Sequence, residues 1–458
     1  MSTAHDKKTL EDFALKGMAH AKMTGVMVAT HGISDSFLLL HSGVGCKYKT
    51  ASQSAVHDWG EHSNRREAWT QVAELELVHG VSGRVGPFAR AWWERRHSAL
   101  MVVVSAYFIE LTGDDLGAAV REVEATLDNC PMVVVSTKAP NDGFFDGFAA
   151  VMHDVLARLD WTAPAKNDRG VTVLGNFFHR YEPDTKADVS QLKGLLKACG
   201  LETGAVLFSG QTWAETKTAP DARYVLTLPY TKPADKKLAK LLKGRKVIAA
   251  DLPIGLAGTA RFVQTVADAV GADRRKVDAW IKAQNDAVRT QLDNVSERFR
   301  NLKLAVYAET PLAAGVVTLL HEMGIRVVLV GLRDKAGCLG GREAFLETLS
   351  RNGVPVGDME IFVDPSLRST RERVSELLGR DALDGVIGST HELDVLRHLP
   401  AQSARLTSAF LMEVGFPSDQ HHAAFMMPTF GFTGAVIWAQ RLLDAVHPAR
   451  IGDANRLG

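Results

Sequence analysis

The residues best suited to chemistry lie in a short run between positions 37 and 46. An apolar stretch, Phe37–Leu40, has the composition of a short buried strand, and it leads into His-Ser-Gly-Val-Gly-Cys at 41–46. The glycines at 43 and 45 favour a tight turn, and Cys46 leaves that turn. A lone cysteine is commonly a small buried side chain. The alternative is that Cys46 is one ligand of a metal cluster whose other ligands belong to another chain.

The remaining cysteines cannot complete such a site within this chain. The four cysteines stand at positions 46, 130, 199 and 338 and form no Cys-x-x-Cys pair. This spacing excludes a ferredoxin-like or zinc-ribbon site built from this chain alone. The scarcity of cysteine also argues against a disulfide-stapled secreted protein. Cys130 precedes a predicted strand and Cys199 ends a predicted helix, so we interpret both as structural thiols.

Length and composition describe an ordinary globular protein. A chain of 458 residues suggests about three domains. Lys plus Arg and Asp plus Glu each number 53, so the absence of net charge gives no indication of nucleic acid or an anionic membrane as a partner. The N-terminus lacks the apolar core of a signal peptide, and the longest apolar run, 99–109, is too short to cross a bilayer. We expect a cytoplasmic location.

Strands alternate with helices along the chain, which is typical of parallel, doubly wound sheets. The clearest unit is a strand at 303–308, a helix at 312–323 and a strand at 326–330. A further strand is predicted at 385–388, and a long helical stretch at 274–299. Neither a GxxxxGK[ST] phosphate loop nor a GxGxxG fingerprint follows a strand, so this chain is not expected to bind ATP or NAD(P)H itself.

Helix breaks, linkers and helix caps separate these elements along the chain. Gly25 is a potential break in an apolar helical stretch, the polar segment 161–170 is interpreted as a linker, and Thr112 to Asp115 can cap the helix that follows. The predicted fold class is α/β, with three Rossmann-like, doubly wound parallel-sheet domains. The expected boundaries are 1–165 with the Cys46 turn, 166–300, and 301–458 with a C-terminal helix that packs back.

Five segments, in the expected order, resemble component 1 of nitrogenase and its relatives, the dark-operative tetrapyrrole reductases and the methylthio-alkane reductases. Residues 41–46 are similar to the family's His-Gly-Pro-x-Gly-Cys cluster turn. The other four segments are 74–80, 110–115, 251–255, and 415–422 together with 428–435. The resemblance covers the whole length and implies the three-domain fold of that family.

Departures from the family pattern are informative. Only Cys46 matches the three cysteines that each subunit gives to the larger clusters of the family. Tyr107, after Ser105, stands where the third ligand would fall, and the upstream ligand would fall near His20. The cysteine and histidine that hold the catalytic cofactor in the α-type subunit have no match in this chain. Cys338 does not stand in that cofactor-binding context. The Asp-Gln-His-His stretch at 419–422 resembles the β-type C-terminus, so the chain is interpreted as a β-type subunit without a catalytic residue of its own.

The resemblance implies that Cys46, on the turn with Gly45, holds an iron–sulfur cluster shared with a partner. A [4Fe–4S] cluster would take three cysteines from the partner and one from this chain. A larger, P-cluster-like cluster would require Tyr107, Ser105 or His20 as a further ligand. The implied partners are an α-type nitrogenase-like subunit, in an α2β2 heterotetramer, and a transient ATP-dependent homodimeric [4Fe–4S] reductase, with no nucleic acid and no membrane.

The expected function is electron relay to a substrate site in the α-type partner. Reductive C–S cleavage of methylthio-alkanes is the favoured reaction, because the three-cysteine set of a dinitrogen-reducing β-subunit is absent. The chain also ends at Gly458, soon after the C-terminal signature, without the extra domain usual in β-type tetrapyrrole-reductase subunits. The alternatives are a chlorophyllide-type reductase subunit, a nitrogenase β-subunit, a scaffold on which an iron–sulfur cofactor matures, and a metal-free α/β binding protein.

Overall fold

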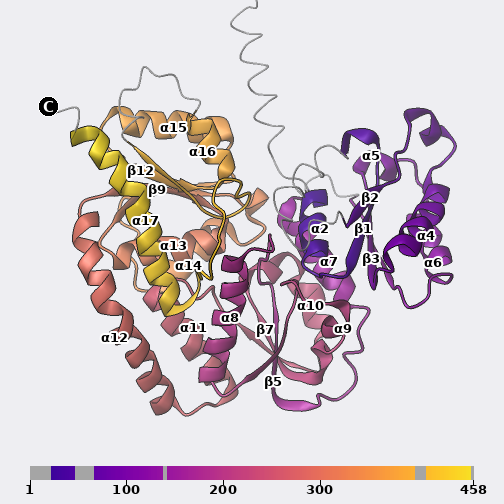
Figure 1. The fold of residues 1–458 in the computed structure, drawn as a ribbon, viewed down its shortest axis with the longest axis horizontal. Helices are drawn as coiled ribbons and strands as arrows, with labels where there is room; N and C mark the ends of the chain where they lie inside the picture. Colours follow the sequence, from indigo (N-terminus) through magenta and orange to yellow (C-terminus); the bar gives the residue numbers. More distant parts are fainter. Residues whose placement is uncertain (1–21, 47–65, 138–141, 398–408, 455–458) are drawn as a thin grey trace, which may run out of the picture. The chain divides into compact units, whose positions relative to one another are not determined.

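The structure is a computed structural model that describes residues 22–46, 66–137, 142–397 and 409–454 (Figure 1). It contains three parallel β-sheets covered by helices. The chain divides into two compact units. The two-sheet unit comprises described residues up to 189 together with 200–249, and the one-sheet unit comprises 190–199 and the residues from 250 onward.

The first sheet has the strand order β2-β1-β3-β4. Its strands are β1 (Ser36–His41), β2 (Glu67–Trp69), β3 (Leu100–Ser105) and β4 (Met132–Val135), all parallel. Helices α2 (Lys22–His31) and α7 (Phe144–Leu156) pack together, whereas α4 (Val85–Arg96) and α6 (Leu116–Glu124) cover the opposite face. Every residue of β1 and β3 is therefore buried, which accounts for their apolar runs at 37–40 and 100–104.

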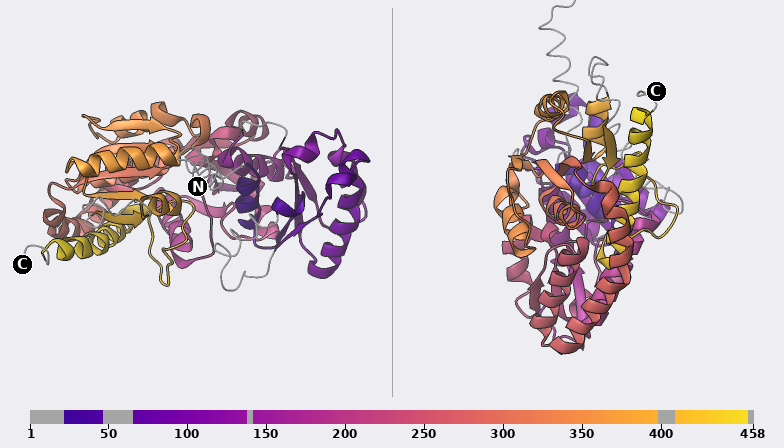
Figure 2. Two further views of the ribbon diagram at one scale, coloured as in Figure 1. Left: turned by 90° about the horizontal axis from the view of Figure 1, so that it is seen from above. Right: turned by 90° about the vertical axis from the view of Figure 1, so that its left-hand side faces the viewer.

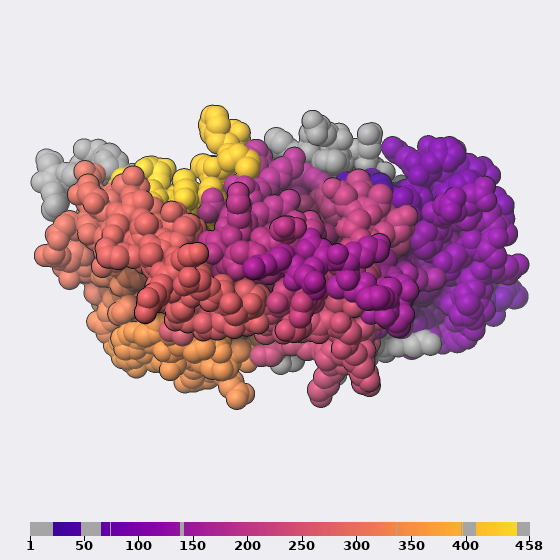
Figure 3. Space-filling view, turned by 90° about the horizontal axis from the view of Figure 1, so that it is seen from below, coloured from indigo at the N-terminus to yellow at the C-terminus, as the bar shows by residue number. Residues whose placement is uncertain are grey.

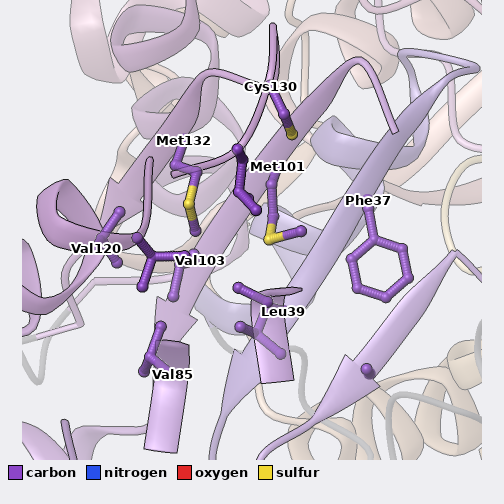
Figure 4. Packing of buried hydrophobic residues seen from close by; sticks show 12 residues of the cluster. Phe37, Leu39, Val85, Met101, Val103, Val120, Cys130 and Met132 are labelled. Carbon is purple, nitrogen blue, oxygen red and sulfur yellow. The ribbon is translucent and has the colours of Figure 1, made fainter. Parts of the chain in front are cut away.

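Alternate residues of these strands form the core beneath α4 and α6. Figure 4 shows Phe37 and Leu39 of β1 beside Met101 and Val103 of β3, with Val85 and Val120 from the covering helices. Because side chains alternate across a strand, His41 continues the row of Phe37 and Leu39 at its carboxyl end.

Helix α2 continues through Gly25, so the predicted break there is wrong. A Cβ atom at Gly25 would lie 1.8 Å from the carbonyl oxygen of Phe144, and one at Gly147 would lie 2.0 Å from that of Lys22. The two glycines thus allow the backbones of α2 and α7 to meet. Glycine serves here for close helix packing and not for a turn.

The second sheet, also in the two-sheet unit, has the order β6-β5-β7-β8. Its strands are β5 (Asn167–Leu174), β6 (Glu202–Val206), β7 (Ala222–Thr227) and β8 (Lys246–Ala249), with α9 (Trp213–Thr216) and α10 (Asp235–Leu241) between them; residues of α8 (Pro183–Ala198) belong to both units. The predicted linker 161–170 is wrong in two respects. Trp161 is buried and donates its indole N–H to the Leu156 carbonyl at 2.9 Å, and β5 already begins at Asn167.

The third sheet has the order β11-β10-β9-β12-β13, which matches five of the six strands of the doubly wound Rossmann order. Its strands are β9 (Lys303–Ala308), β10 (Arg326–Leu332), β11 (Glu360–Val363), β12 (Gly385–Gly388) and β13 (Phe410–Glu413). Its helices are α11 (Gly255–Val270), α12 (Arg274–Phe299), α13 (Thr310–Glu322), α14 (Gly341–Arg351), α15 (Leu367–Gly379), α16 (Thr390–Arg397) and α17 (Gly431–Ala454). Strands β9 and β12 and helix α12 have the bounds that the sequence predicts.

The C-terminal helix lies on the one-sheet unit. Helix α17 runs beside α12 (Figure 2), and Trp280 meets Phe432 with ring centroids 5.9 Å apart. Figure 3 shows α12, in salmon, on the surface, and only Val277, Ile281, Leu292 and Phe299 of its residues are buried. The three parallel sheets confirm the predicted α/β, Rossmann-like fold class. None of the helices in the described part of the chain is long and apolar enough to cross a membrane.

Candidate functional site

The carboxyl ends of β1 and β3 lie side by side in the first sheet. His41 is in register with Ser105, and the Ala106 amide donates to the His41 carbonyl at 2.9 Å. Strand β2 lies beyond β1 and β4 beyond β3, so the chain leaves this point toward opposite edges of the sheet. Open α/β sheets bind ligands outside the carboxyl ends of their strands at such a switch point.

Cys46 lies at this switch point, in a helical turn at 44–46. Its half-buried side chain packs against a small apolar cluster of Val72, Val81, Ala106 and Ile109. The structure therefore brings Cys46 next to the segment that contains Ser105 and Tyr107, although these residues are about sixty positions away in the sequence.

The two glycines of the turn provide space. Neither Gly43 nor Gly45 has a positive φ angle, so the expectation that the turn requires glycine for its backbone conformation is wrong. A Cβ atom on Gly43 would lie 3.5 Å from the Phe108 ring, and one on Gly45 would meet nothing within 4 Å. The backbone beside Cys46 is thus open to a bulky group.

Exposed apolar side chains lie on the segments that adjoin Cys46 in sequence or pack near it, and we call them the apolar rim. They come from the turn itself, from the short helix η2 (Glu74–Val78) and from the segment after β3. Their exposed fractions are Val44 49%, Leu75 85%, Val78 80%, Tyr107 43%, Phe108 39% and Leu111 70%. Large apolar side chains gathered at the surface are typical of a protein–protein contact.

Ser105 and Tyr107 differ in their surroundings. Ser105 is buried, and its hydroxyl donates to the carboxylate of Glu110, which also accepts from the Thr137 amide at 3.0 Å. The Thr137 hydroxyl donates to the Ser105 carbonyl at 2.7 Å. Ser105 thus takes part in a bridge between the ends of β3 and β4. Tyr107, the first residue of α5 (Tyr107–Glu110), is partly exposed on the apolar rim.

Carboxylates hold the loops around the thiol. The Asp114 carboxylate accepts from the Val81 and Ser82 amides at 2.5 and 3.0 Å. Asp115 caps α6 by accepting from the Ala118 amide at 2.8 Å, which confirms its predicted role. The sequence predicts the same capping role for Asp114, but its carboxylate instead fixes the loop that carries Val81. Val81 belongs to the cluster against which Cys46 packs.

His41 is a member of the site that sequence reasoning treated only as part of a motif. Its side chain is buried, and Nδ1 lies 2.9 Å from the hydroxyl of Thr70. Burial lowers the pKa of His41 to about 4; Arg84 also lowers it, against the opposing effect of Asp114 and Glu110. The imidazole is therefore neutral at pH 7. Nε2 is shielded from solvent and has no hydrogen-bond partner among the described residues.

The other cysteines lie elsewhere. Cys130 and Cys199 are buried, and burial raises the pKa of each thiol to about 12, with Glu124 adding to the effect at Cys130. Both remain protonated at neutral pH, which agrees with their interpretation as structural thiols. Cys338 follows the turn Lys335–Gly337 on the one-sheet unit. His20 lies outside the described residues.

The corresponding point of the third sheet is filled by its own side chains. Where β9 adjoins β12, Arg333 forms an ion pair with Glu392 at 2.9 Å and donates to the Ser389 hydroxyl at 2.8 Å. Beside it, Glu413 accepts from the Ser418 hydroxyl and from the amides of residues 419–421. These groups satisfy one another.

The donor set at Cys46 fits one half of a shared cluster site. Among the residues that the structure describes, no three His, Cys, Asp or Glu side chains form a group that could hold a metal ion. One half-buried thiol, open backbone at Gly45 and a rim of exposed apolar side chains are suited to a cluster completed by ligands from a second chain.

The chain matches the family model for nitrogenase component 1 type oxidoreductase over residues 21–447. It belongs to this family, which confirms the resemblance carried by the five sequence segments. A solved structure, "Nitrogenase Cp1 at pH 6.5", shares its fold with a TM-score of 0.76 and 17% identity, over 94% of this chain and 92% of the other.

Curated relatives have several roles. The chain is similar to the nitrogenase molybdenum-iron protein beta chain of Bradyrhizobium sp. (strain ANU 289), 19% identical over 96% of this chain and 86% of the relative. It is 23% identical to the nitrogenase iron-molybdenum cofactor biosynthesis protein NifE of Clostridium pasteurianum, over 67% of this chain and 66% of that protein. It is 22% identical to the light-independent protochlorophyllide reductase subunit N of Acidiphilium rubrum, over 68% and 71%.

Proposed function

We propose that this chain is the β-type subunit of a nitrogenase-like two-component reductase. In this role it gives Cys46 to an iron–sulfur cluster at its contact with an α-type partner, in an α2β2 complex. When bound, the cluster would supply one-electron transfer between an ATP-dependent iron–sulfur reductase and a substrate site in the α-type partner. The observation that carries the proposal is the position of Cys46, half-buried at the switch point of the first sheet, with the exposed side chains of the apolar rim on the neighbouring segments.

The chain's own residues would shape and shield that contact. Val44, Phe108 and Leu111 offer apolar surface that a partner subunit would cover, and removal of water there would strengthen electrostatic effects at the cluster. Asp114 holds the loop at Val81 in place behind the thiol. Gly45 would leave room for the cluster to approach the backbone.

The nuclearity of the cluster depends on Tyr107. With Cys46 alone, a [4Fe–4S] cluster with three partner cysteines is the simplest arrangement, and it is the one we propose. A larger cluster would need a second ligand from this chain, and the exposed phenol of Tyr107 is better suited than the hydroxyl of Ser105, which is bonded to Glu110.

For the reaction itself, we propose reductive C–S cleavage of methylthio-alkanes. The single cysteine at the cluster turn supports this choice over a dinitrogen-reducing β-subunit. The similarity to the protochlorophyllide reductase subunit N supports a tetrapyrrole reductase as the second candidate. The similarity to NifE supports a third, a scaffold for cofactor maturation, which would show no turnover with its own reductase.

Anaerobic co-expression with the adjacent-gene partners tests the proposal. We expect a heteromeric complex that contains iron and acid-labile sulfide and turns over a methylthio-alkane when its reductase and ATP are added. An iron-free monomer, purified anaerobically with the partner present, would contradict the subunit role. Turnover of chlorophyllide, or transfer of cluster without turnover, would select the second or third candidate.

A further inference from the structure

We infer that the ring Nε2–H of His41 donates a hydrogen bond to the cluster held by Cys46 and thereby raises its reduction potential. This inference rests on the proposed function. His41 would be a positioning and tuning residue, because it donates a hydrogen bond to the cluster and does not transfer its proton.

The contacts of Thr70 indicate which ring nitrogen of His41 carries the proton. The Thr70 hydroxyl oxygen accepts from the Ser42 amide at 3.2 Å and lies 2.9 Å from Nδ1 of His41. If the hydroxyl donates to Nδ1, both groups are satisfied and the imidazole proton is on Nε2. In the other tautomer, the Thr70 proton and the Nε2 lone pair would both lack partners. Since Thr70 is fully buried, the tautomer with Nε2–H is favoured.

The strands on either side of β1 indicate the direction of Nε2. Thr70 follows β2, which lies on one side of β1, whereas β3 lies on the other. Because Nδ1 faces Thr70 on the β2 side, we take Nε2, on the opposite side of the ring, to face the β3 side of β1. Ala106, which follows β3, is in the cluster of side chains that contacts Cys46. In this orientation the N–H faces the end of the sheet at which Cys46 lies.

The Nε2–H of His41 also needs a hydrogen-bond acceptor. A buried N–H without an acceptor is unfavourable and rare in folded proteins. Nε2 has none among the described residues and is shielded from solvent. Cluster sulfides and cysteine thiolates accept hydrogen bonds, and such bonds stabilise the more negative, reduced state. A cluster beside Cys46 would supply the acceptor that this donor lacks.

The test uses two variants of the heteromeric complex. Gln can place an amide N–H near the position of Nε2, whereas Asn reaches only the position of Nδ1 and keeps the contact with Thr70. We expect His41→Asn to lower the midpoint potential of the cluster, measured by EPR-monitored redox titration, and His41→Gln to stay close to the wild-type value. Equal potentials in all three complexes at equal iron content would overturn the inference.

A spectroscopic measurement covers the case in which a variant does not assemble. In wild-type complex labelled with ¹⁵N-histidine, pulsed EPR of the reduced cluster should show weak ¹⁵N coupling across the hydrogen bond, and this coupling should vanish in His41→Gln. Absence of histidine coupling in the wild-type complex would contradict the inference, because an ordered water or a protein group would then accept the proton. Absence of any iron–sulfur signal in the wild type would instead contradict the proposed function.

Discussion

The buried imidazole of His41 should make the stability of this chain depend on pH, and replacing it should remove that dependence. In the folded chain its pKa is about 4, whereas an unfolded histidine titrates near 6.5. Between these values the unfolded state binds a proton that the native state does not. The stabilisation is therefore complete above pH 6.5 and is lost as the pH falls from 6.5 toward 4.

The size of the effect follows from these two values. Between pH 7 and pH 5 the difference in proton binding costs about 2 kcal/mol of unfolding free energy. His41→Gln has no titrating group at this position and should lose about 2 kcal/mol less than the wild type over the same interval. Other titrating groups contribute equally to both proteins and cancel in the comparison.

Urea unfolding of the iron-free chain, followed by tryptophan fluorescence at pH 7 and pH 5, measures this difference. His321→Gln, which replaces an exposed histidine on α13, is measured at the same two pH values as the matched control. If His41→Gln and the wild type lose the same stability between the two pH values, His41 is not a buried neutral imidazole. The tautomer argument would then fail with it.

Three further predictions concern the scaffold and the ligands. Gly25→Ala should destabilise the chain by about 3 kcal/mol in thermal melts, because its methyl group would overlap the carbonyl of Phe144, whereas Gly194→Ala on the open face of α8 should cost nothing. Asp114→Ala should speed hydrogen exchange at the Val81 amide, since the carboxylate that accepts from the Val81 and Ser82 amides is lost; unchanged exchange would show that the loop is held by other contacts. The complex without its reductase should not bind ATP or NAD(P)H at micromolar concentration, and calorimetric binding of either would contradict the sequence interpretation.

Much of the fold could be predicted because its signals are local. Strand β9, strand β12 and helix α12 lie where the sequence places them, since each is an apolar or amphipathic run with clear ends; Asp273 caps α12 through the amides of residues 275 and 276. Strand β2 was missed because it has only three residues and includes Glu67. The role of Gly25 was misread because contact with another helix cannot be seen in sequence.

The site could be predicted only in part, for the same reason. Cys46 is visible as a lone thiol after a glycine-rich turn, and the family motif singles it out. The buried state of Ser105, its bond to Glu110 and the lack of a partner for His41 Nε2 among the described residues depend on which segments the sheet brings together. Sequence spacing carries no signal of these contacts, because Ser105 and His41 meet only through the pairing of β1 with β3.

The measurement that most directly tests the account is low-temperature EPR with iron analysis on the reduced complex, comparing Cys46→Ala with the same change at each of the other three cysteines. We predict that Cys46→Ala loses or alters the cluster signal while the chain stays folded, because Gly45 and the apolar cluster at Val72 do not depend on the thiol. The variants Cys130→Ala, Cys199→Ala and Cys338→Ala should keep the wild-type signal and turnover. A wild-type signal and turnover in Cys46→Ala, with their loss in another cysteine variant, would contradict the assignment of this site.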